Sequence, residues 1–475
     1  MTENVRKILS DSKAARWTAL LIVSFTMFAG YYLADVMAPL QGLVQNQLSW
    51  SATEYGFFTS AYGWFNVFLF LLIIGGIILD KFGIRVTGIG AALIMVAGTS
   101  LKYYAISTSS LDGIDVTLPI LGTWKAQVML AALGYAIFGV GVEITGITAS
   151  KAIVKWFKGR EMALAMGMQL SVARLGTALA LSTSLPIARM SGHVSTPLLF
   201  CLIMLCIGVL AFSVYAMMDR KLDASIVAAR AQSDDQTPED EKFKLSDIFN
   251  ILGNRGWWYI ALLCVLFYSA VFPFLKYATD LMIQKFGVNA NWAGSLPGLL
   301  PFGTIFFTPL FGGIYDKIGK GATIMIIGAT IITAVHLLFA VPLLNHWSIA
   351  IVLMMLLGIG FSLVPSAMWP SVPKIIPDRQ LGTAFSLIFW VQNWGLMGVP
   401  ALIGWVLDKY CITGTKIVDG QPVHTYNYTI PMLIFMSFGL LAIGLGFLLK
   451  LEDKKKGYGL QLPNIKKAPT ENAQA

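Results

Sequence analysis

A short polar loop occurs twice in this chain, half a chain apart. The first copy reads GGIILDKFGIR over residues 75–85, and the second reads GGIYDKIGK over residues 312–320. Both copies close a long apolar stretch, and both keep Gly-Gly-Ile, Asp-Lys and a following glycine. A duplicated membrane domain is the simplest source of such a pair, because many secondary transporters are built from repeated halves. The loop therefore predicts two related helical halves in one membrane protein.

The composition also indicates a membrane protein. Apolar residues make up 56% of the 475 residues and charged residues 12%, which is roughly half the charged share of an average soluble domain. About twelve uninterrupted apolar stretches have close to the ~20 residues that a helix needs to cross the hydrocarbon core. We predict spanning helices near residues 17–44, 53–79, 86–106, 126–153, 161–188, 196–218, 256–284, 290–315, 321–341, 347–373, 379–407 and 427–450.

Lysine and arginine gather on one side of these predicted helices. Nearly all of them lie in the two ends of the chain and in the connections that follow even-numbered helices, at residues 6–16, 81–85, 155–160, 220–230 and 454–456. This bias predicts that both termini are cytoplasmic. The net charge of +9 then reflects topology and contact with an anionic leaflet, not nucleic-acid binding. We expect a multi-pass protein of the cell (inner) membrane, although an organelle membrane stays open.

Polar runs divide the chain into four regions. We predict a first six-helix bundle at 1–218, a cytoplasmic linker at 219–255, a second bundle at 256–450 and a disordered cytoplasmic tail at 451–475. Between the last two helices, residues 417–423 combine a turn pair with β-forming neighbours and predict a small hairpin.

Ionisable side chains in the middle of a membrane are costly, so they are candidates for function. The predicted helices contain Asp35, Glu143, Lys151, Arg174, Lys276 and Asp280. Lys276 and Asp280 are one helical turn apart, so we expect them to satisfy each other, and Lys151 is close enough to a helix end to snorkel. Asp35 lies in the outer half of the first helix. Glu143 and Arg174 remain, both near the middle of sequential antiparallel helices. They either form a buried ion pair, which stabilises poorly after desolvation, or bind the two ends of a zwitterionic ligand.

The surroundings of these two residues resemble a known family. The relevant stretches read YGWFNV at 62–67, GVGVE at 139–143, WFKGRE at 156–161, GMQLSVARLG at 167–176, VFPF at 271–274, QLGTA at 380–384 and QNWG at 392–395. Together with the duplicated loop, they resemble the major facilitator superfamily, and within it the branch of lysosomal dipeptide transporters and their bacterial relatives. The resemblance runs from about residue 30 to 408. It implies an all-α fold of 12 transmembrane helices in two pseudo-symmetric six-helix bundles, working by alternating access.

The resemblance also implies roles for individual residues. The glutamate in helix four binds the peptide's amino end and the arginine in helix five binds its carboxylate, and here these positions are Glu143 and Arg174. We expect the pocket walls to come from aromatic and amide side chains, namely Tyr31, Tyr62, Tyr268, Trp369 and Asn393.

The duplicated loops imply a cytoplasmic gate. In the superfamily's architecture, Asp80 faces the start of helix eleven at Arg379, while Asp316 faces the start of helix five at Arg160. Arg85 of the first loop belongs to the same predicted gate. A carboxylate near a helix N-terminus gains roughly 0.3–1 kcal/mol from the unpaired amides and the helix dipole. We therefore expect these contacts to close the cytoplasmic side.

We expect a monomeric dipeptide transporter that uses no cofactor or metal and whose partners are its substrate and the lipid bilayer. Two alternatives stay open. A monocarboxylate or other organic-anion transporter would use Arg174 alone, and a non-transporting membrane sensor is a different class. An enzyme is not expected, because no His or Cys is placed beside a nucleophile or in metal-ligand spacing.

Overall fold

The computed structural model describes residues 8–118, 122–157, 162–230, 245–377, 380–418 and 421–463. In this part of the chain, eleven helices are long and apolar enough to cross a membrane, and a bent helix pair makes a twelfth span. The long helices are α1 (Lys13–Asp35), α5 (Leu71–Ser107), α6 (Ala126–Phe157), α7 (Met162–Ser191), α8 (Thr196–Arg230), α10 (Arg255–Gln284), α11 (Ser295–Ile318), α12 (Gly321–Ala340), α13 (Trp347–Ile375), α14 (Leu381–Tyr410) and α15 (Thr429–Lys456). The shorter elements are η1 (Leu9–Asp11), η2 (Ala38–Leu40), α2 (Gln41–Leu48), α3 (Ala52–Ser60), η3 (Ala61–Gly63), α4 (Trp64–Phe68), α9 (Leu245–Leu252) and the strands β1 (Asp115–Leu118), β2 (Gly122–Lys125), β3 (Ile412–Val418) and β4 (Gln421–Tyr426).

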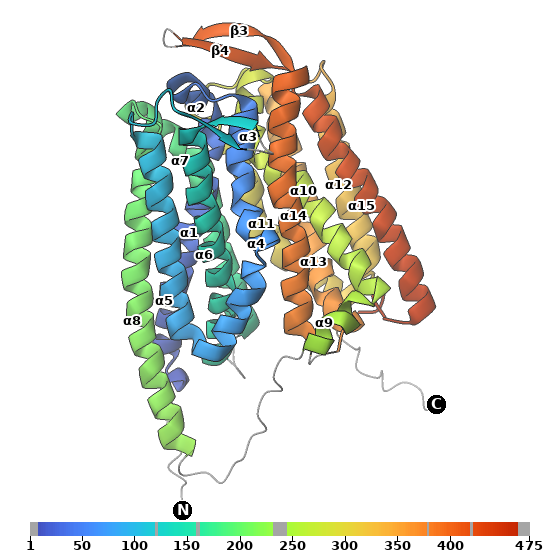
Figure 1. Ribbon diagram of the computed structural model, residues 1–475. Helices are drawn as coiled ribbons and strands as arrows, with labels where there is room; N and C mark the ends of the chain where they lie inside the picture. The colour runs from blue at the N-terminus through green and yellow to red at the C-terminus, as the bar shows by residue number, and fades with distance from the viewer. Residues whose placement is uncertain are drawn as a thin grey trace, which may run out of the picture.

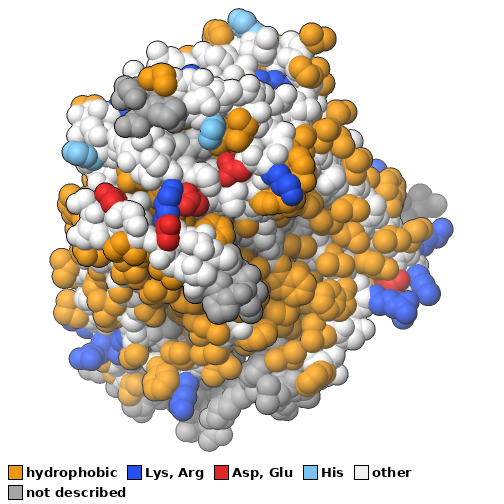
Figure 2. All heavy atoms as spheres, turned by 45° about the horizontal axis from the view of Figure 1, so that its top comes forward, with side chains coloured by type: hydrophobic (Ala, Val, Ile, Leu, Met, Phe, Trp, Pro, Cys, Tyr) orange, Lys and Arg blue, Asp and Glu red, His pale blue; other side chains and the backbone are white. Residues whose placement is uncertain are grey.

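Two groups of helices stand side by side, which we call the first half (α1–α8) and the second half (α10–α15) (Figure 1). The antiparallel hairpins β1–β2 and β3–β4 lie at one end, here called the hairpin end. The predicted hairpin at 417–423 is thus confirmed and is longer than expected. Helix α9, η1 and residues 457–463 lie at the opposite end, here called the terminal end. Figure 2 shows a broad apolar belt on the flank, with charged side chains toward the ends, as a bilayer requires.

The second predicted helix is not continuous. Helices α3 and α4 and the start of α5 share the predicted span 53–79, and the chain bends by 57° between Phe68 and Leu71. The break falls at Phe70, which has a left-handed conformation (φ 54°, ψ 28°). A side chain pays a conformational cost in this region, so no periodicity argument could have placed the bend.

The two copies of the duplicated loop have the same backbone feature at their glycine. Gly83 has φ 79° and ψ 174°, and Gly319 has φ 74° and ψ −137°. Only glycine adopts these combinations readily, because a Cβ would clash with the backbone. The glycine of the motif therefore turns the chain from one spanning helix into the next in both halves, which agrees with an internal duplication.

Each loop is anchored differently. In the first half, Arg85 makes ion pairs with Asp219 (3.4 Å) and Asp223 (2.7 Å) of α8, and Lys155 of α6 contacts the same two carboxylates at 2.8 and 2.7 Å. These acids belong to α8, which continues to Arg230. The prediction that the linker begins at residue 219 is therefore wrong, because the first polar residues after the apolar stretch bind the loop.

In the second half, the loop is anchored by the chain's own C-terminal segment. The backbone amides of Lys320 and Gly321 donate to the carbonyls of Gln461 (3.0 Å) and Leu460 (2.9 Å). Leu460 is fully buried, and Lys374 donates to the carbonyl of Leu462 at 3.0 Å. The prediction of a disordered tail from residue 451 is thus wrong for residues 451–463. The buried Leu460 side chain and these hydrogen bonds hold the segment against the second half.

Candidate functional site

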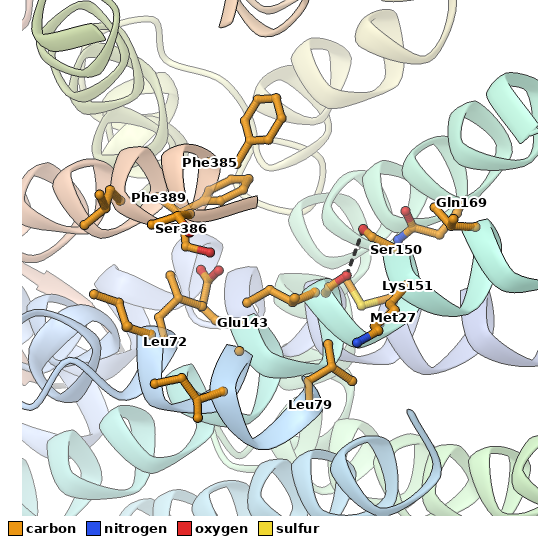
Figure 3. A pocket seen from close by; sticks show the side chains of 18 of the residues that line it. Met27, Leu72, Leu79, Glu143, Ser150, Lys151, Gln169, Phe385, Ser386 and Phe389 are labelled. Carbon is orange, nitrogen blue, oxygen red and sulfur yellow. Dashed lines mark hydrogen bonds between the residues drawn. The ribbon is translucent and has the colours of Figure 1, made fainter. Parts of the chain in front are cut away.

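A cavity of about 690 Å³ lies between the two halves and extends to the terminal end, where Leu79, Val154 and Ile248 line it (Figure 3). The first half provides most of its wall, from α1, α5, α6 and α7, and α14 faces them from the second half. Its polar or charged lining residues are Tyr31, Glu143, Ser150, Lys151, Gln169, Thr383 and Ser386. The remaining surface is aliphatic and aromatic, so a ligand in this cavity meets few polar groups.

Glu143 of α6 is the carboxylate of this cavity. The hydroxyl of Tyr62 donates to Glu143 Oε1 at 2.7 Å, and Glu143 points toward Ser386 of α14 in Figure 3. The contact with Tyr62 depends on a close backbone approach, because a Cβ on Gly139, one turn earlier in α6, would lie 2.2 Å from the Tyr62 carbonyl oxygen. Glycine at this position therefore lets the two helices position the carboxylate.

Arg174 of α7 is held by aromatic rings at the junction of the halves. Its guanidinium carbon lies 5.7 Å from the ring centre of Tyr31, 5.0 Å from that of Phe272 and 5.7 Å from that of Phe361. Such contacts stabilise a cation while leaving its hydrogen-bond donors unused. Tyr31 lines the cavity and Arg174 does not, so in this conformation the ring of Tyr31 lies between the guanidinium and the open space.

Glu143 and Arg174 form no ion pair with each other among the described residues. The interpretation as a buried ion pair, left open from the sequence, is therefore not what the structure has. Glu143 lines the cavity and Arg174 contacts Tyr31 in its wall, and neither charge is neutralised by an ion pair with a described residue. This arrangement suits a ligand that carries both charges.

The other predicted wall residues occupy different places. Tyr268 stacks on Phe272 with ring centres 5.3 Å apart, so it belongs to the cluster that holds Arg174. Trp369 packs 5.2 Å from Phe389, which lines the cavity. Asn393 is fully buried, its amide donates to the Phe389 carbonyl at 2.9 Å, and it does not line the cavity. Of the five predicted wall residues only Tyr31 lines the cavity in this conformation. A role of Tyr62, Tyr268, Trp369 and Asn393 in substrate binding stays a prediction.

Comparison with known proteins assigns the family. The model of the Major Facilitator Superfamily matches residues 20–400. This chain belongs to the major facilitator superfamily. The relatives and solved structures that match this chain are transporters, so the chain is a multi-pass membrane transporter and not an enzyme.

Similar sequences and structures agree with this assignment. The chain is 29% identical over 415 residues to the lysosomal dipeptide transporter MFSD1 of Bos taurus, with 83% of this chain and 80% of the relative covered. It is 28% identical over 418 residues to the Homo sapiens protein of the same name, with 83% and 81% covered.

Among solved structures, the D-xylose-proton symporter is similar with a TM-score of 0.64 and 16% identity. The match covers 90% of this chain and 97% of the symporter. A bacterial homolog of the human lysosomal transporter Spinster, in an inward-facing and occupied conformation, is similar with a TM-score of 0.62 and 13% identity. This match covers 97% of this chain and 100% of that protein. These structural likenesses show the superfamily fold of two six-helix bundles.

Polar cavity residues were missed from the sequence. Gln169, Ser150 and Ser386 line the cavity, and Lys151, which we expected to snorkel, lines it too. Gln169 lies within the GMQLSVARLG stretch, so the motif itself held the available signal. Ser150 and Ser386 had none, because serine is common in spanning helices and its hydroxyl can bond the preceding turn, as Ser150 does to the Gly146 carbonyl at 3.1 Å.

A buried lysine was also missed. Lys102 of α5 is fully buried, and its ammonium lies 4.2 Å from the ring centre of Tyr135 and 5.0 Å from that of Phe58. Its Nζ has no hydrogen-bond partner among the described residues. Its burial could not be predicted, because Lys102 falls near the predicted end of its helix, where a lysine ordinarily reaches water.

The predicted pairing of Lys276 with Asp280 is wrong. Lys276 of α10 makes an ion pair with Asp35 of α1 at 2.7 Å and donates to the Ala34 carbonyl at 2.6 Å. Asp280 instead accepts from the hydroxyl of Tyr428. Helix α10 directs Lys276 toward the first half, so a contact between halves replaces the local one.

The predicted cytoplasmic gate stays a prediction. Arg85 contacts α8 of its own half, and Asp316 is partly buried at the terminal end. The side chain of Asp80 and residues Arg160 and Arg379 lie outside the described residues. In the described ranges, no group of three or more His, Cys, Asp or Glu is placed to hold a metal ion.

Proposed function

We propose that this transporter moves short peptides, dipeptides above all, by alternating access of its two halves. Glu143 binds the ammonium end of the peptide and Arg174 its carboxylate. The observation that carries the proposal is that a carboxylate in the cavity and a guanidinium against the wall residue Tyr31 form no ion pair with each other. The similarity to relatives named lysosomal dipeptide transporters over most of both chains supports it.

The chemistry of the two groups fits the two ends of a peptide. A guanidinium offers a planar, always charged fork that matches a carboxylate, and a carboxylate accepts from an ammonium. Tyr31 separates Arg174 from the cavity in this conformation, so the peptide carboxylate reaches Arg174 when the Tyr31 ring moves aside. A clamp on both main-chain ends selects length, while the largely apolar walls accept varied side chains.

The charge bias of the loops supports a sidedness for the cavity. We place both termini in the cytoplasm, because lysine and arginine gather on that side. The terminal end then faces the cytoplasm, and the conformation described here opens inward. We further propose the cell (inner) membrane as its location. We also propose two six-helix bundles joined by a cytoplasmic linker as the outline of its domains, with α8 extending the first bundle to Arg230 and residues 451–463 belonging to the second.

Uptake into proteoliposomes tests the proposal. Removing one partner of a desolvated charge pair costs on the order of 2–5 kcal/mol, so Glu143→Gln and Arg174→Ala each reduce uptake of a labelled dipeptide to background. Arg255→Ala and Glu452→Gln, outside the cavity, are matched controls and retain uptake.

Uptake of a simple monocarboxylate by the wild type, lost in Arg174→Ala but kept in Glu143→Gln, would contradict the dipeptide proposal and favour the organic-anion alternative. Unchanged dipeptide uptake in both cavity variants would also contradict it. A membrane sensor would show no uptake of either solute.

A further inference from the structure

At the hairpin end, a carboxylate of one half binds the start of a helix of the other. Asp408 lies in the last turn of α14, in the second half. Its two oxygens accept hydrogen bonds from the backbone amides of Ala52 (3.0 Å) and Thr53 (2.6 Å), the first two residues of α3. The first amides of a helix have no partner within the helix, and its N-terminus attracts negative charge.

Helix α3 caps itself only in part. Ser51 and Glu54 form a capping box, in which the Ser51 hydroxyl accepts from the Glu54 amide at 3.1 Å and the Glu54 carboxylate accepts from the Ser51 amide at 2.8 Å. The box leaves the amides of Ala52 and Thr53 for Asp408. Separation of the halves at this end therefore takes away the only side-chain acceptor that these two amides have among the described residues.

The β3–β4 hairpin holds Asp408 in place. Tyr426, the last residue of β4, donates to Asp408 Oδ1 at 3.3 Å and accepts from Gln45 of α2 at 3.1 Å. Its backbone amide donates to Gln284 of α10 at 2.6 Å. Burial and the neighbouring Asp408 carboxylate raise the pKa of Tyr426, so its hydroxyl keeps its proton. One hairpin residue thus joins two helices of the second half to the first half.

The backbones also meet closely here. A Cβ on Gly404, one turn before Asp408, would lie 2.3 Å from the Ala52 carbonyl oxygen, and one on Gly56 would lie 2.6 Å from the Pro400 carbonyl oxygen. Paired glycines let α3 and α14 approach until the carboxylate reaches the amides.

We propose that Asp408 is a gating residue of the hairpin end, where it closes the transporter by capping α3 across the two halves and releases when α14 moves away. It uses the charge–helix interaction that the duplicated loops predict for the opposite end. The proposal depends on membership in the transporter family and not on the identity of the substrate.

Labelling of a buried cysteine tests the gate without any substrate. Thr59 of α3 is 3% exposed, so Thr59→Cys in the full chain reports opening of the hairpin end to a membrane-impermeant maleimide. Labelling is compared with the parent protein, which contains the four native cysteines. Asp408→Ala raises the labelling rate roughly three- to thirty-fold, and Asp112→Asn, an exposed acid at the same end, is the matched control and leaves it unchanged.

A second variant removes the same bond from the other half. Ala52→Pro deletes one donor amide at the first helical position, where proline is tolerated because Ser51 is extended. Ala52→Pro also raises the labelling rate. Because both substitutions remove the same contact, the rate of the double variant stays below the product of the two single effects. An unchanged labelling rate in folded Asp408→Ala, or full multiplicativity in the double variant, would overturn the proposal. Dipeptide uptake is measured separately, so a wrong substrate assignment leaves this result intact.

Discussion

The hairpin end and the terminal end of this transporter differ in how the two halves meet. At the hairpin end, Asp408 caps α3, Lys276 pairs with Asp35, and the halves touch through glycine backbones. Toward the terminal end, a cavity separates the first half from α14, and Arg85 binds within its own half. The ion pair and the helix cap between the halves therefore lie toward the hairpin end, while Trp390 of α14 donates to the Val67 carbonyl of α4 at 3.1 Å beside the helix break.

The difference also shows how modest the closing forces are. A net hydrogen bond contributes about 0.5–1.5 kcal/mol, and one to a charged group about 1.5–3 kcal/mol. A few such bonds stabilise one conformation by a few kcal/mol, which is the range in which a ligand can shift a two-state equilibrium.

The largest effect is expected from the glycine contact at the hairpin end. Gly404→Ala places a Cβ 2.3 Å from the Ala52 carbonyl oxygen, so α3 and α14 cannot approach fully. We expect transport to fall by more than about tenfold, since 1.4 kcal/mol of strain already changes an equilibrium by that factor. Gly398→Ala in the same helix meets nothing within 4 Å and is the control. Equal uptake by both variants in a liposome assay would show that the close contact is not needed.

The next largest effect is expected from one of two buried lysines, Lys276 and Lys102, which differ in whether they have an ion-pair partner. Lys276→Met leaves Asp35 buried without its cation and should cost about 3–5 kcal/mol of stability. Lys102→Met removes a cation that has no hydrogen-bond partner in the described part of the chain, so it should be neutral or stabilising. Thermal unfolding in detergent measures both. A loss of stability in Lys102→Met as large as that in Lys276→Met would contradict this distinction.

Much of this architecture could be predicted from the sequence, because spanning length, charge bias and a repeated loop all depend on local composition. Glu143 and Arg174 stood out because few charges lie inside the helices. The partner of Lys276 could not be predicted, since helix rotation depends on packing with the other half. Asp408 was missed for the same reason: at a helix end it resembles any surface acid until α3 is placed beside it.

A smaller effect is expected inside the cavity, between the two ends. Tyr62→Phe removes the hydroxyl that donates to Glu143 and leaves the ring in place. Loss of one bond to a charged group should weaken dipeptide binding roughly tenfold without altering the hairpin-end contacts. Binding measured by a thermal shift over a range of dipeptide concentrations checks this, with Tyr103→Phe on α5 as control. Wild-type affinity in Tyr62→Phe would mean that Tyr62 does not orient the carboxylate.

The smallest effect on stability is expected at the terminal end. Arg85 is 36% exposed and its nearer partner Asp223 equally so, and exposed ion pairs contribute about 0–1 kcal/mol. Its second partner, Asp219, is buried but keeps Lys155 at 2.8 Å when Arg85 is removed. Arg85→Ala should therefore change the melting temperature little, yet slow turnover several-fold, because the duplicated loop is predicted to close this end. Arg220→Ala, exposed on α8, is the control. Normal turnover in well-folded Arg85→Ala protein would leave the loop with a structural role alone.

The most direct test of the central claim is a binding measurement on the purified wild-type protein. Calorimetric titration with alanyl-alanine, its N-acetyl derivative, its C-terminal amide and free alanine separates the two ends of the ligand. The Glu143–Arg174 clamp predicts that only the unmodified dipeptide binds well, with each end-blocked form weakened at least about thirtyfold. Equal affinity for the N-acetyl derivative and the free dipeptide would contradict it.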